Sequence, residues 1–303
     1  MNLNSIWSVL EESFDILGDY GYPAIDKVAD ELDLEPGYFT WLAAIWLFGS
    51  ETITTEKYMR MFPYGLARVN DERFASAVRK GYLVSDGKDG YVHTEAGLSV
   101  ARKMWRVAGD SLADLRPLPN EHLQRLFSYF DRLIEASLSA PEPSAHFYIS
   151  HKRDNYGRYG TKCPLEDFVV HFGALAAYRD DAHIATWQAH EIEGHAWEIL
   201  TYLWRSDSAA SVEQLFENVG YRGIPIEIYV LDLQKLCERG WVAENADEYQ
   251  LTAEGKQIRE EAEVLTDRYF FTPWTCLSEA EQEDVLSLAT QLRDGLQNPK
   301  EKL

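Results

Sequence analysis

The stretch that decides the fold occurs twice, as Arg79-Lys-Gly-Tyr-Leu-Val84 with Tyr91-Val-His-Thr-Glu-Ala-Gly97, and as Glu238-Arg-Gly-Trp-Val242 with Tyr249-Gln-Leu-Thr-Ala-Glu-Gly255. In each occurrence a glycine is placed where it can end a helix in the left-handed conformation. Two short β-prone runs then flank a turn, which is typical of a hairpin. The threonine that follows is a preferred N-cap for another helix. Both stretches therefore predict a helix, a two-stranded hairpin and a second helix in immediate succession.

The similarity extends beyond these two stretches. When the sequence is shifted against itself by 158 residues, apolar residues come into register, and in places the shift becomes 159, as loop insertions produce. The matched pairs include Phe14/Phe172, Leu17/Leu175, Leu42/Leu200, Trp46/Trp204, Tyr91/Tyr249, Leu126/Val285 and Leu133/Leu292. We interpret the chain as a duplication. Its parts are copy one (1–137), a linker with a basic and aromatic loop (138–165), copy two (166–297) and a polar tail (298–303).

The spacing of apolar residues predicts a mainly α-helical chain with two small β-hairpins. The expected helices that bear on function are 5–18, 24–33 and 70–80 in copy one, and 183–204 and 225–239 in copy two. The stretch 146–162 has no clear period, so we expect an ordered loop there.

Helix, short helix, glycine-terminated helix, hairpin and a Thr-x-x-Gly helix together resemble the winged-helix unit of the MarR-type regulators. The resemblance rests on residues 79–97 and 238–255. Helices on both sides of the unit also match that family, where they form the dimer interface. The resemblance covers nearly all of both copies. It implies tandem duplicated winged helix-turn-helix domains with flanking dimerisation-type helices, fused as a single-chain pseudo-dimer. The same small domain also serves as a dimerisation module in some methyltransferases, so the fold alone does not decide the function.

Composition limits the classes of partner. The chain has 303 residues, 46% of them hydrophobic, and a formal net charge of −21. Its longest apolar run, Trp41–Phe48, is far shorter than the roughly 20 residues that span a bilayer. The N-terminus lacks the pattern of a secretion signal. The three cysteines are far apart in sequence, which indicates a reducing compartment. We expect a cytoplasmic protein with no membrane partner.

The resemblance to winged-helix proteins raises the question of DNA. The second helix of a helix-turn-helix enters the major groove. The DNA-binding residues predicted in copy one are Arg68, Arg73, Arg79, Lys80 and Lys88. Residues 1–137 hold 14 basic and 21 acidic side chains, whereas residues 168–303 hold 11 and 25. Because phosphate contacts supply most of the affinity for DNA, we expect low-affinity binding to double-stranded DNA, dominated by copy one.

Copy two differs from copy one in its histidines. His183 and His190 align with Ile25 and Leu32 of copy one, seven residues apart, and should share one helical face. We predict a ligand site formed by His171, Tyr178, His183, Trp187, His190 and Trp197, for a small aromatic or anionic molecule. The alternatives are buried histidines at the interface between the copies, or a metal site. Recognisable zinc spacings are absent, so we assign neither a metal nor a cofactor.

The loop between the copies is the least acidic part of the chain. Lys152, Arg153, Arg158 and Lys162 alternate there with tyrosines. This composition predicts a contact with phosphate or single-stranded nucleic acid, with packing across the acidic copies as the alternative.

The sequence therefore favours a MarR-like, ligand-responsive transcription regulator with weak or degenerate DNA binding. The first alternative is a small-molecule-binding or scaffold protein that kept the winged-helix fold and lost DNA binding. The second is an enzyme that uses the copy-two histidines, although no catalytic residue is assigned and a non-enzyme is favoured. The expected assembly is a monomer that acts as a pseudo-dimer, or a homodimer.

Overall fold

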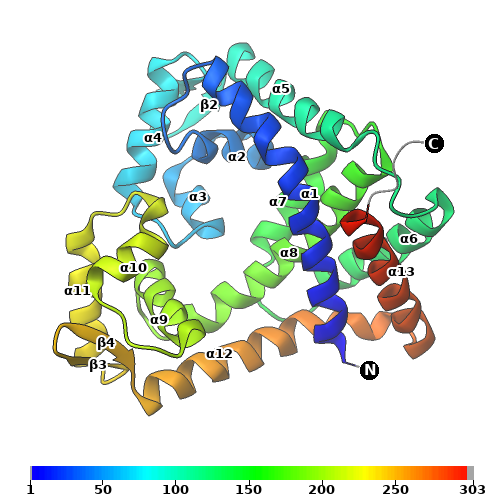
Figure 1. Ribbon diagram of the computed structural model, residues 1–303. Coiled ribbons are helices and arrows are strands. Elements are labelled where there is room, and N and C mark those ends of the chain that lie inside the picture. Colours follow the sequence, from blue (N-terminus) through cyan, green and yellow to red (C-terminus); the bar gives the residue numbers. More distant parts are fainter. Residues whose placement is uncertain (1, 299–303) are drawn as a thin grey trace.

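The computed structural model describes residues 2–298 and contains two sets of helices and strands in the same order (Figure 1). The first set is α1 (Leu3–Glu31), α2 (Phe39–Phe48), α3 (Thr55–Met61), α4 (Ala67–Arg79), β1 (Leu83–Ser85), β2 (Tyr91–His93), α5 (Glu95–Leu112) and α6 (Asn120–Leu138). A connecting segment follows, made of α7 (Phe147–Asn155) and the 3₁₀ helix η1 (Tyr156–Tyr159).

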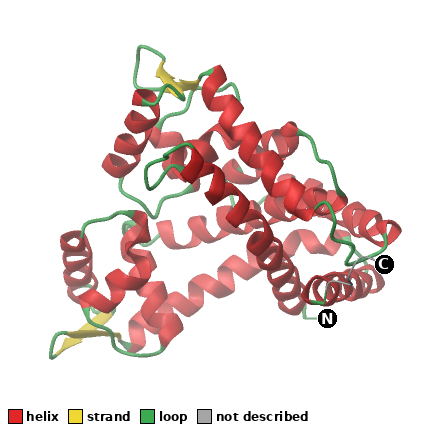
Figure 2. Cartoon of the chain, turned by 45° about the horizontal axis from the view of Figure 1, so that its top comes forward, coloured by secondary structure: helices red, strands yellow, loops and turns green. Residues whose placement is uncertain are grey.

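The second set is α8 (Pro164–Gln188), α9 (Gly194–Ser206), α10 (Val212–Val219), the 3₁₀ helix η2 (Gly220–Arg222), α11 (Ile226–Glu238), β3 (Val242–Asn245), β4 (Glu248–Leu251), α12 (Ala253–Phe271), the 3₁₀ helix η3 (Thr272–Cys276) and α13 (Glu279–Gln297). Each pair of strands forms an antiparallel hairpin. The predicted mainly α-helical fold with small hairpins is confirmed. The two hairpins lie far apart on one side of the molecule (Figure 2).

Both hairpins begin and end as the sequence predicts. Gly81 and Gly240 end the preceding helices with φ angles of 78° and 74°, a conformation that favours glycine. Thr94 and Thr252 each accept a hydrogen bond from a backbone amide three residues further on, at 3.0 and 3.1 Å. Local sequence therefore fixes the junction between hairpin and helix in both sets.

The first helix of each set packs against the last helix of the other set. α1 lies against α13 as well as α5, and α8 lies against α6 as well as α12. Where α1 and α8 meet, the rings of Phe14 and Phe172 are 4.7 Å apart and those of Trp7 and Phe172 are 4.9 Å apart. One hydrophobic core includes residues of both sets, and a second core lies within residues 184–262.

Two expected helices in copy one are a single helix. The sequence predicts separate helices at 5–18 and 24–33, but α1 runs from Leu3 to Glu31 with Pro23 inside it. A proline removes one backbone donor from a helix, and contacts with α5 and α13 offset this cost. The helix expected over 70–80 also begins earlier, at Ala67.

The single helix predicted over 183–204 is wrong, because two helices occupy this stretch. α8 ends at Gln188 and α9 begins at Gly194. Glu191 in the turn has a φ of 52°, and Arg239 donates hydrogen bonds to the carbonyl oxygens of His190 and Glu191 at 2.7 and 3.0 Å. The expected loop over 146–162 is also wrong in part, since α7 and η1 occupy much of it.

A search of the described helices for a stretch both long and apolar enough to cross a bilayer finds none.

Substitution Gly255→Ala tests the close packing at the second hairpin. An added Cβ would clash with the carbonyl oxygen of Trp241, which is backbone and cannot move aside easily. We expect a loss of roughly 1–3 kcal/mol in the free energy of unfolding, measured by urea denaturation. The matched control is Gly21→Ala in α1, where the new Cβ would lie 3.6 Å from the Ala108 Cβ. Equal losses in the free energy of unfolding for Gly255→Ala and Gly21→Ala would contradict the close packing at Gly255.

Candidate functional site

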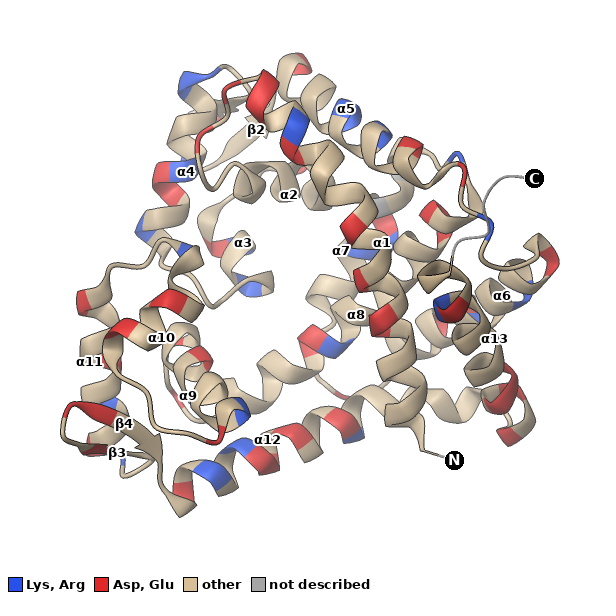
Figure 3. Ribbon diagram, in the orientation of Figure 1, with Lys and Arg blue, Asp and Glu red and all other residues tan. Residues whose placement is uncertain are grey.

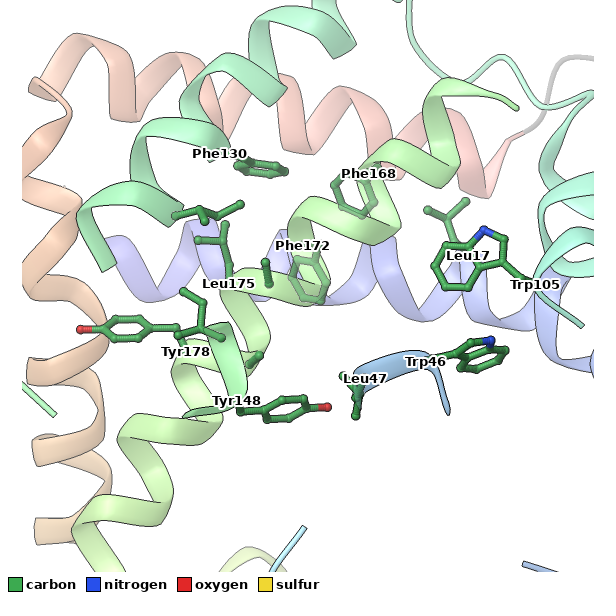
Figure 4. Close-up of a cluster of buried hydrophobic side chains, with 14 of the residues drawn as sticks. Leu17, Trp46, Leu47, Trp105, Phe130, Tyr148, Phe168, Phe172, Leu175 and Tyr178 are labelled. Carbon is green, nitrogen blue, oxygen red and sulfur yellow. The ribbon is translucent and has the colours of Figure 1, made fainter. Parts of the chain in front are cut away.

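A largely apolar cavity of about 570 Å³ lies against the first set and is lined by residues of α1, α2, α3, α4 and α5, together with residues of α7, α8 and η2. The aromatic residues in its wall include Phe14, Phe39, Trp46, Tyr58, Phe62 and Trp105. In Figure 4 the Tyr148 side chain points toward Leu47 of α2. A mostly apolar cavity of this size with a few polar groups is typical of a small-molecule site.

Small residues keep this cavity open. Gly37, Ala43, Ala108 and Gly109 lie in its wall. The residues 158 positions further along the chain are His195, Thr201, Thr266 and Asp267, each of them larger. This difference in side-chain size indicates why the first set contains a cavity, whereas larger side chains fill the corresponding place in the second set.

A buried arginine lies among these larger residues in the second set. Arg259 is 1% exposed and forms an ion pair with Glu263 at 2.5 Å. Its Nε donates a hydrogen bond to Thr201 at 3.1 Å, and its guanidinium lies 5.2 and 4.6 Å from the ring centres of Trp197 and Trp204. The residue 158 positions earlier is Ala101. The second set thus holds a packed polar network.

His183 belongs to the same network. The indole nitrogen of Trp197 donates a hydrogen bond to His183 Nε2 at 3.1 Å. Desolvation, together with the nearby charge of Arg259, lowers the pKa of His183 to about 4, while Glu263 opposes the shift. The imidazole is therefore neutral at pH 7 and acts as a hydrogen-bond acceptor toward Trp197.

Two arginines line the cavity beside the first set. Arg73 of α4 donates a hydrogen bond to Thr40 of α2 at 3.2 Å and another to the carbonyl oxygen of Arg222 at 2.8 Å. Arg222 itself forms short hydrogen bonds to both carboxylate oxygens of Glu198, at 2.6–2.8 Å. Arg73 therefore connects α4 to the cavity and to the second set.

The connecting segment brings a lysine to the cavity. Lys152 of α7 lines it, with its Nζ 5.8 Å from the ring centre of Tyr148. Desolvation lowers the pKa of Lys152 to about 7, while the carboxylate of Asp180 opposes the shift. The α7 N-terminus is held by Asp181, which accepts hydrogen bonds from the backbone amides of Tyr148 and Ile149 at 3.0–3.1 Å.

Four of the six predicted ligand residues come together. His183, Trp187 and His190 all surround Trp197, with ring centres 6.0–6.2 Å from it. His190 lies in the turn after α8, so the predicted shared helical face is wrong.

The other two predicted ligand residues lie apart from that group. His171 stacks on Phe127 of α6 at 5.0 Å, and the Tyr178 hydroxyl donates a hydrogen bond to the carbonyl oxygen of Glu142 at 2.8 Å. None of the six lines the 570 Å³ cavity. Within residues 2–298, no three His, Cys, Asp or Glu side chains are arranged to hold a metal ion.

Four of the five predicted DNA-binding residues are exposed, and the fifth, Arg73, points inward. Arg68, Arg79 and Lys80 are exposed on or beside α4, and Lys88 is exposed in the loop of the first hairpin. Figure 3 shows both basic and acidic positions on α4. Arg79 and Lys80 each lie within 4.0 Å of an acidic side chain. Arg73 points inward to the contacts described above. A free basic face on α4 is therefore narrower than the sequence predicts.

The corresponding helix of the second set presents a different surface. The exposed residues of α11 include Glu227, Leu231, Gln234, Lys235 and Glu238. Leu231 is 50% exposed. Acidic side chains repel phosphate, so this helix is poorly suited to enter a DNA groove.

The predicted basic loop does not present its cations together. Lys152 faces the cavity, Arg153 pairs with Asp154 at 2.8 Å, and Lys162 pairs with Asp110 at 2.8 Å. The side chain of Arg158 lies outside the described part of the chain. The contact with nucleic acid stays a prediction.

Residues 167–300, which cover most of the second set, match the model of a helix-turn-helix family. The chain contains a helix-turn-helix domain. In general terms this match indicates a DNA-binding regulator. No curated protein and no solved structure matches the chain.

Sequence reasoning missed the cavity. It assigned Lys152 to a nucleic-acid loop and placed the ligand site among the copy-two histidines. A signal was present in the internal alignment, where Gly37, Ala43, Ala108 and Gly109 face larger residues 158 positions later. An open pocket requires small residues where helices would otherwise be in contact. At these positions the first set has small residues and the second set has larger ones.

The buried position of His183 predicts a pH dependence of stability. In the unfolded chain this histidine takes up a proton near pH 6.5, but in the folded chain only near pH 4. The unfolded state therefore binds more protons between these values, and stability falls as the pH is lowered from 6.5 to 4. We expect His183 to lower the free energy of unfolding by about 3 kcal/mol over this pH interval.

The variant His183→Gln keeps a hydrogen-bond acceptor for Trp197 but does not titrate. We expect its free energy of unfolding to fall less steeply than that of the wild type from pH 7 to pH 4. His93→Gln, on strand β2, is the control and should follow the wild type. Parallel curves for the wild type and His183→Gln would rule out this role.

Proposed function

We propose that the chain is a MarR-like, ligand-responsive transcription regulator in which two winged-helix units form a single-chain pseudo-dimer. The observation that carries the proposal is the reciprocal packing of α1 on α13 and of α8 on α6. In an isologous dimer each element makes the same contact with its partner that the partner makes with it. The fused chain repeats this pattern between its halves.

Residue pairs near the contact support the same proposal. Phe14 and Phe172, which are 158 positions apart, touch each other at 4.7 Å. Arg125 and Asp284, 159 positions apart, form an ion pair at 2.9 Å. A symmetric homodimer would place like charges at such a site. Fusion into one chain allows opposite charges to replace them.

DNA contact is assigned mainly to α4 and the first hairpin. Arg68, Arg79, Lys80 and Lys88 are the exposed cations there, whereas α11 exposes Glu227 and Glu238. Few phosphate contacts mean low affinity and a strong dependence on salt.

The ligand site is assigned to the 570 Å³ cavity. Its aromatic wall suits an apolar body, and the guanidinium groups of Arg73 and Arg222 suit an anionic group. A ligand that competes for Arg73 would weaken its hydrogen bonds to Thr40 and to the second set. Because Arg73 is part of α4, such binding would alter the position of that helix relative to α11 and so couple the ligand to DNA binding.

The second candidate is a ligand-binding protein that no longer binds DNA. It is favoured by the acidic exposed face of α11 and by Leu231, which is 50% exposed on that helix. The cavity would serve both candidates equally, so DNA binding is the measurement that separates them.

Reversing charge on the first helix-turn-helix tests DNA binding. The double variant Arg68→Glu/Arg79→Glu should weaken binding to DNA fragments by roughly tenfold or more, in fluorescence anisotropy at low salt. Arg106→Glu/Arg116→Glu makes the same change of charge on exposed residues of α5 and the following loop, and should have little effect. Absence of binding to every fragment, including the region upstream of its own gene, would favour the second candidate.

Blocking the cavity tests ligand binding. The probe is 8-anilinonaphthalene-1-sulfonate, an amphipathic aromatic anion whose fluorescence rises in apolar sites. Ala43→Trp fills the cavity wall and should abolish the fluorescence rise, whereas Ala253→Trp at an exposed position of α12 should not. If His183→Ala removes binding and Ala43→Trp does not, the ligand site lies in the second set instead.

A further inference from the structure

We propose that Lys152 forms a reversible covalent imine with amphipathic aldehydes that enter the cavity. This inference rests on the proposed ligand-binding function and adds the chemical class of the ligand. It requires an amine in the cavity wall, room for the ligand body, and a local environment that keeps the amine reactive.

The position of Lys152 meets the first requirement. The residue lies in α7, between the two sets of elements, and lines the cavity together with Tyr148 of the same helix. α7 is fixed at its N-terminus by the buried carboxylate of Asp181, which accepts hydrogen bonds from two backbone amides. α7 also packs against α2, α3 and α8. The amine therefore projects from a well-anchored helix.

The cavity meets the second requirement. Its volume of about 570 Å³ lies within the range of small-molecule sites. Phe14, Phe62 and Trp105 offer apolar surface for an aromatic or alkyl body.

The environment of the amine meets the third requirement. Desolvation lowers the pKa of Lys152 to about 7, so a large fraction of the side chain is neutral at pH 7. The neutral amine is the nucleophile in imine formation, and lysines in such apolar surroundings are known to serve this purpose. Lys162, which does not line the cavity, is 52% exposed.

The reaction needs no oxidant or reductant. The nitrogen lone pair of Lys152 adds to the aldehyde carbon, and the carbonyl oxygen takes up a proton to give a carbinolamine. Loss of water then forms the C=N bond, and hydrolysis reverses the step. Asp180, whose carboxylate interacts electrostatically with Lys152, is the group placed to hold and return the proton. Because α7 packs on α2 and α3, an adduct on Lys152 would act directly on the first helix-turn-helix.

Reductive trapping tests the proposal. The full-length protein is mixed with 2-naphthaldehyde and sodium cyanoborohydride at pH 7, and labelled lysines are located by peptide mass spectrometry. Lys152 should be labelled roughly 10- to 100-fold faster than Lys162. Lys152→Arg, whose guanidinium cannot form the imine, should lose the fast adduct and still bind 8-anilinonaphthalene-1-sulfonate through the apolar wall. Lys162→Arg is the matched control and should be labelled at Lys152 as the wild type is.

A second variant keeps the test decisive if Lys152→Arg does not fold. Ala43→Trp leaves the lysine in place but fills the cavity, and should also lose fast labelling at Lys152. Labelling of Lys152 no faster than of Lys162 would overturn the imine. If 8-anilinonaphthalene-1-sulfonate still binds in that case, the ligand cavity stands without the covalent step. If neither reagent reacts or binds, both the inference and the proposed ligand site fail.

Discussion

The rest of the structure depends on the packing of α1 and α8. These helices meet each other, and each also packs against the last helix of the opposite set. The stacked rings of Trp7, Phe14 and Phe172 lie where the two helices meet. α13 and α6 then cover α1 and α8, each from the opposite set. This arrangement places the two hairpins far apart on one side and brings η2 of the second set to the cavity beside the first set. Buried aromatic area of this kind is a dominant source of stability in a helical core.

The two sets of elements differ in side-chain size at positions 158 residues apart. In the first set, Gly37, Ala43, Ala108 and Gly109 leave a cavity. In the second set, a buried Arg259 with Glu263 and two tryptophans forms a packed network. A buried ion pair contributes little net stability but is costly to break, so the network is better suited to hold one conformation than to admit a ligand. The exposed surfaces of the two sets also differ, because α4 exposes Arg68 and Arg79 whereas α11 exposes Glu227 and Glu238.

The sequence predicts what depends on local structure. The glycine at the end of α4, the hairpin and the cap at Thr94 follow from a few adjacent residues, and the structure confirms each. Helix boundaries set by distant contacts are predicted wrongly. Pro23 is tolerated inside α1 by its neighbours, and the turn after Gln188 is held by Arg239, which is remote in sequence. The cavity also escapes prediction, because Lys152 reaches it only through the placement of α7 against α8.

In the proposed function the ligand enters the 570 Å³ cavity beside the first set, whereas the side chains around Arg259 fill the corresponding place in the second set. Isothermal titration calorimetry with 8-anilinonaphthalene-1-sulfonate measures the number of sites directly. We expect one site per 34.8 kDa chain, which is lost in Ala43→Trp and retained in His183→Gln. Two equivalent sites per chain, or one site that survives Ala43→Trp in a folded protein, would contradict this expectation.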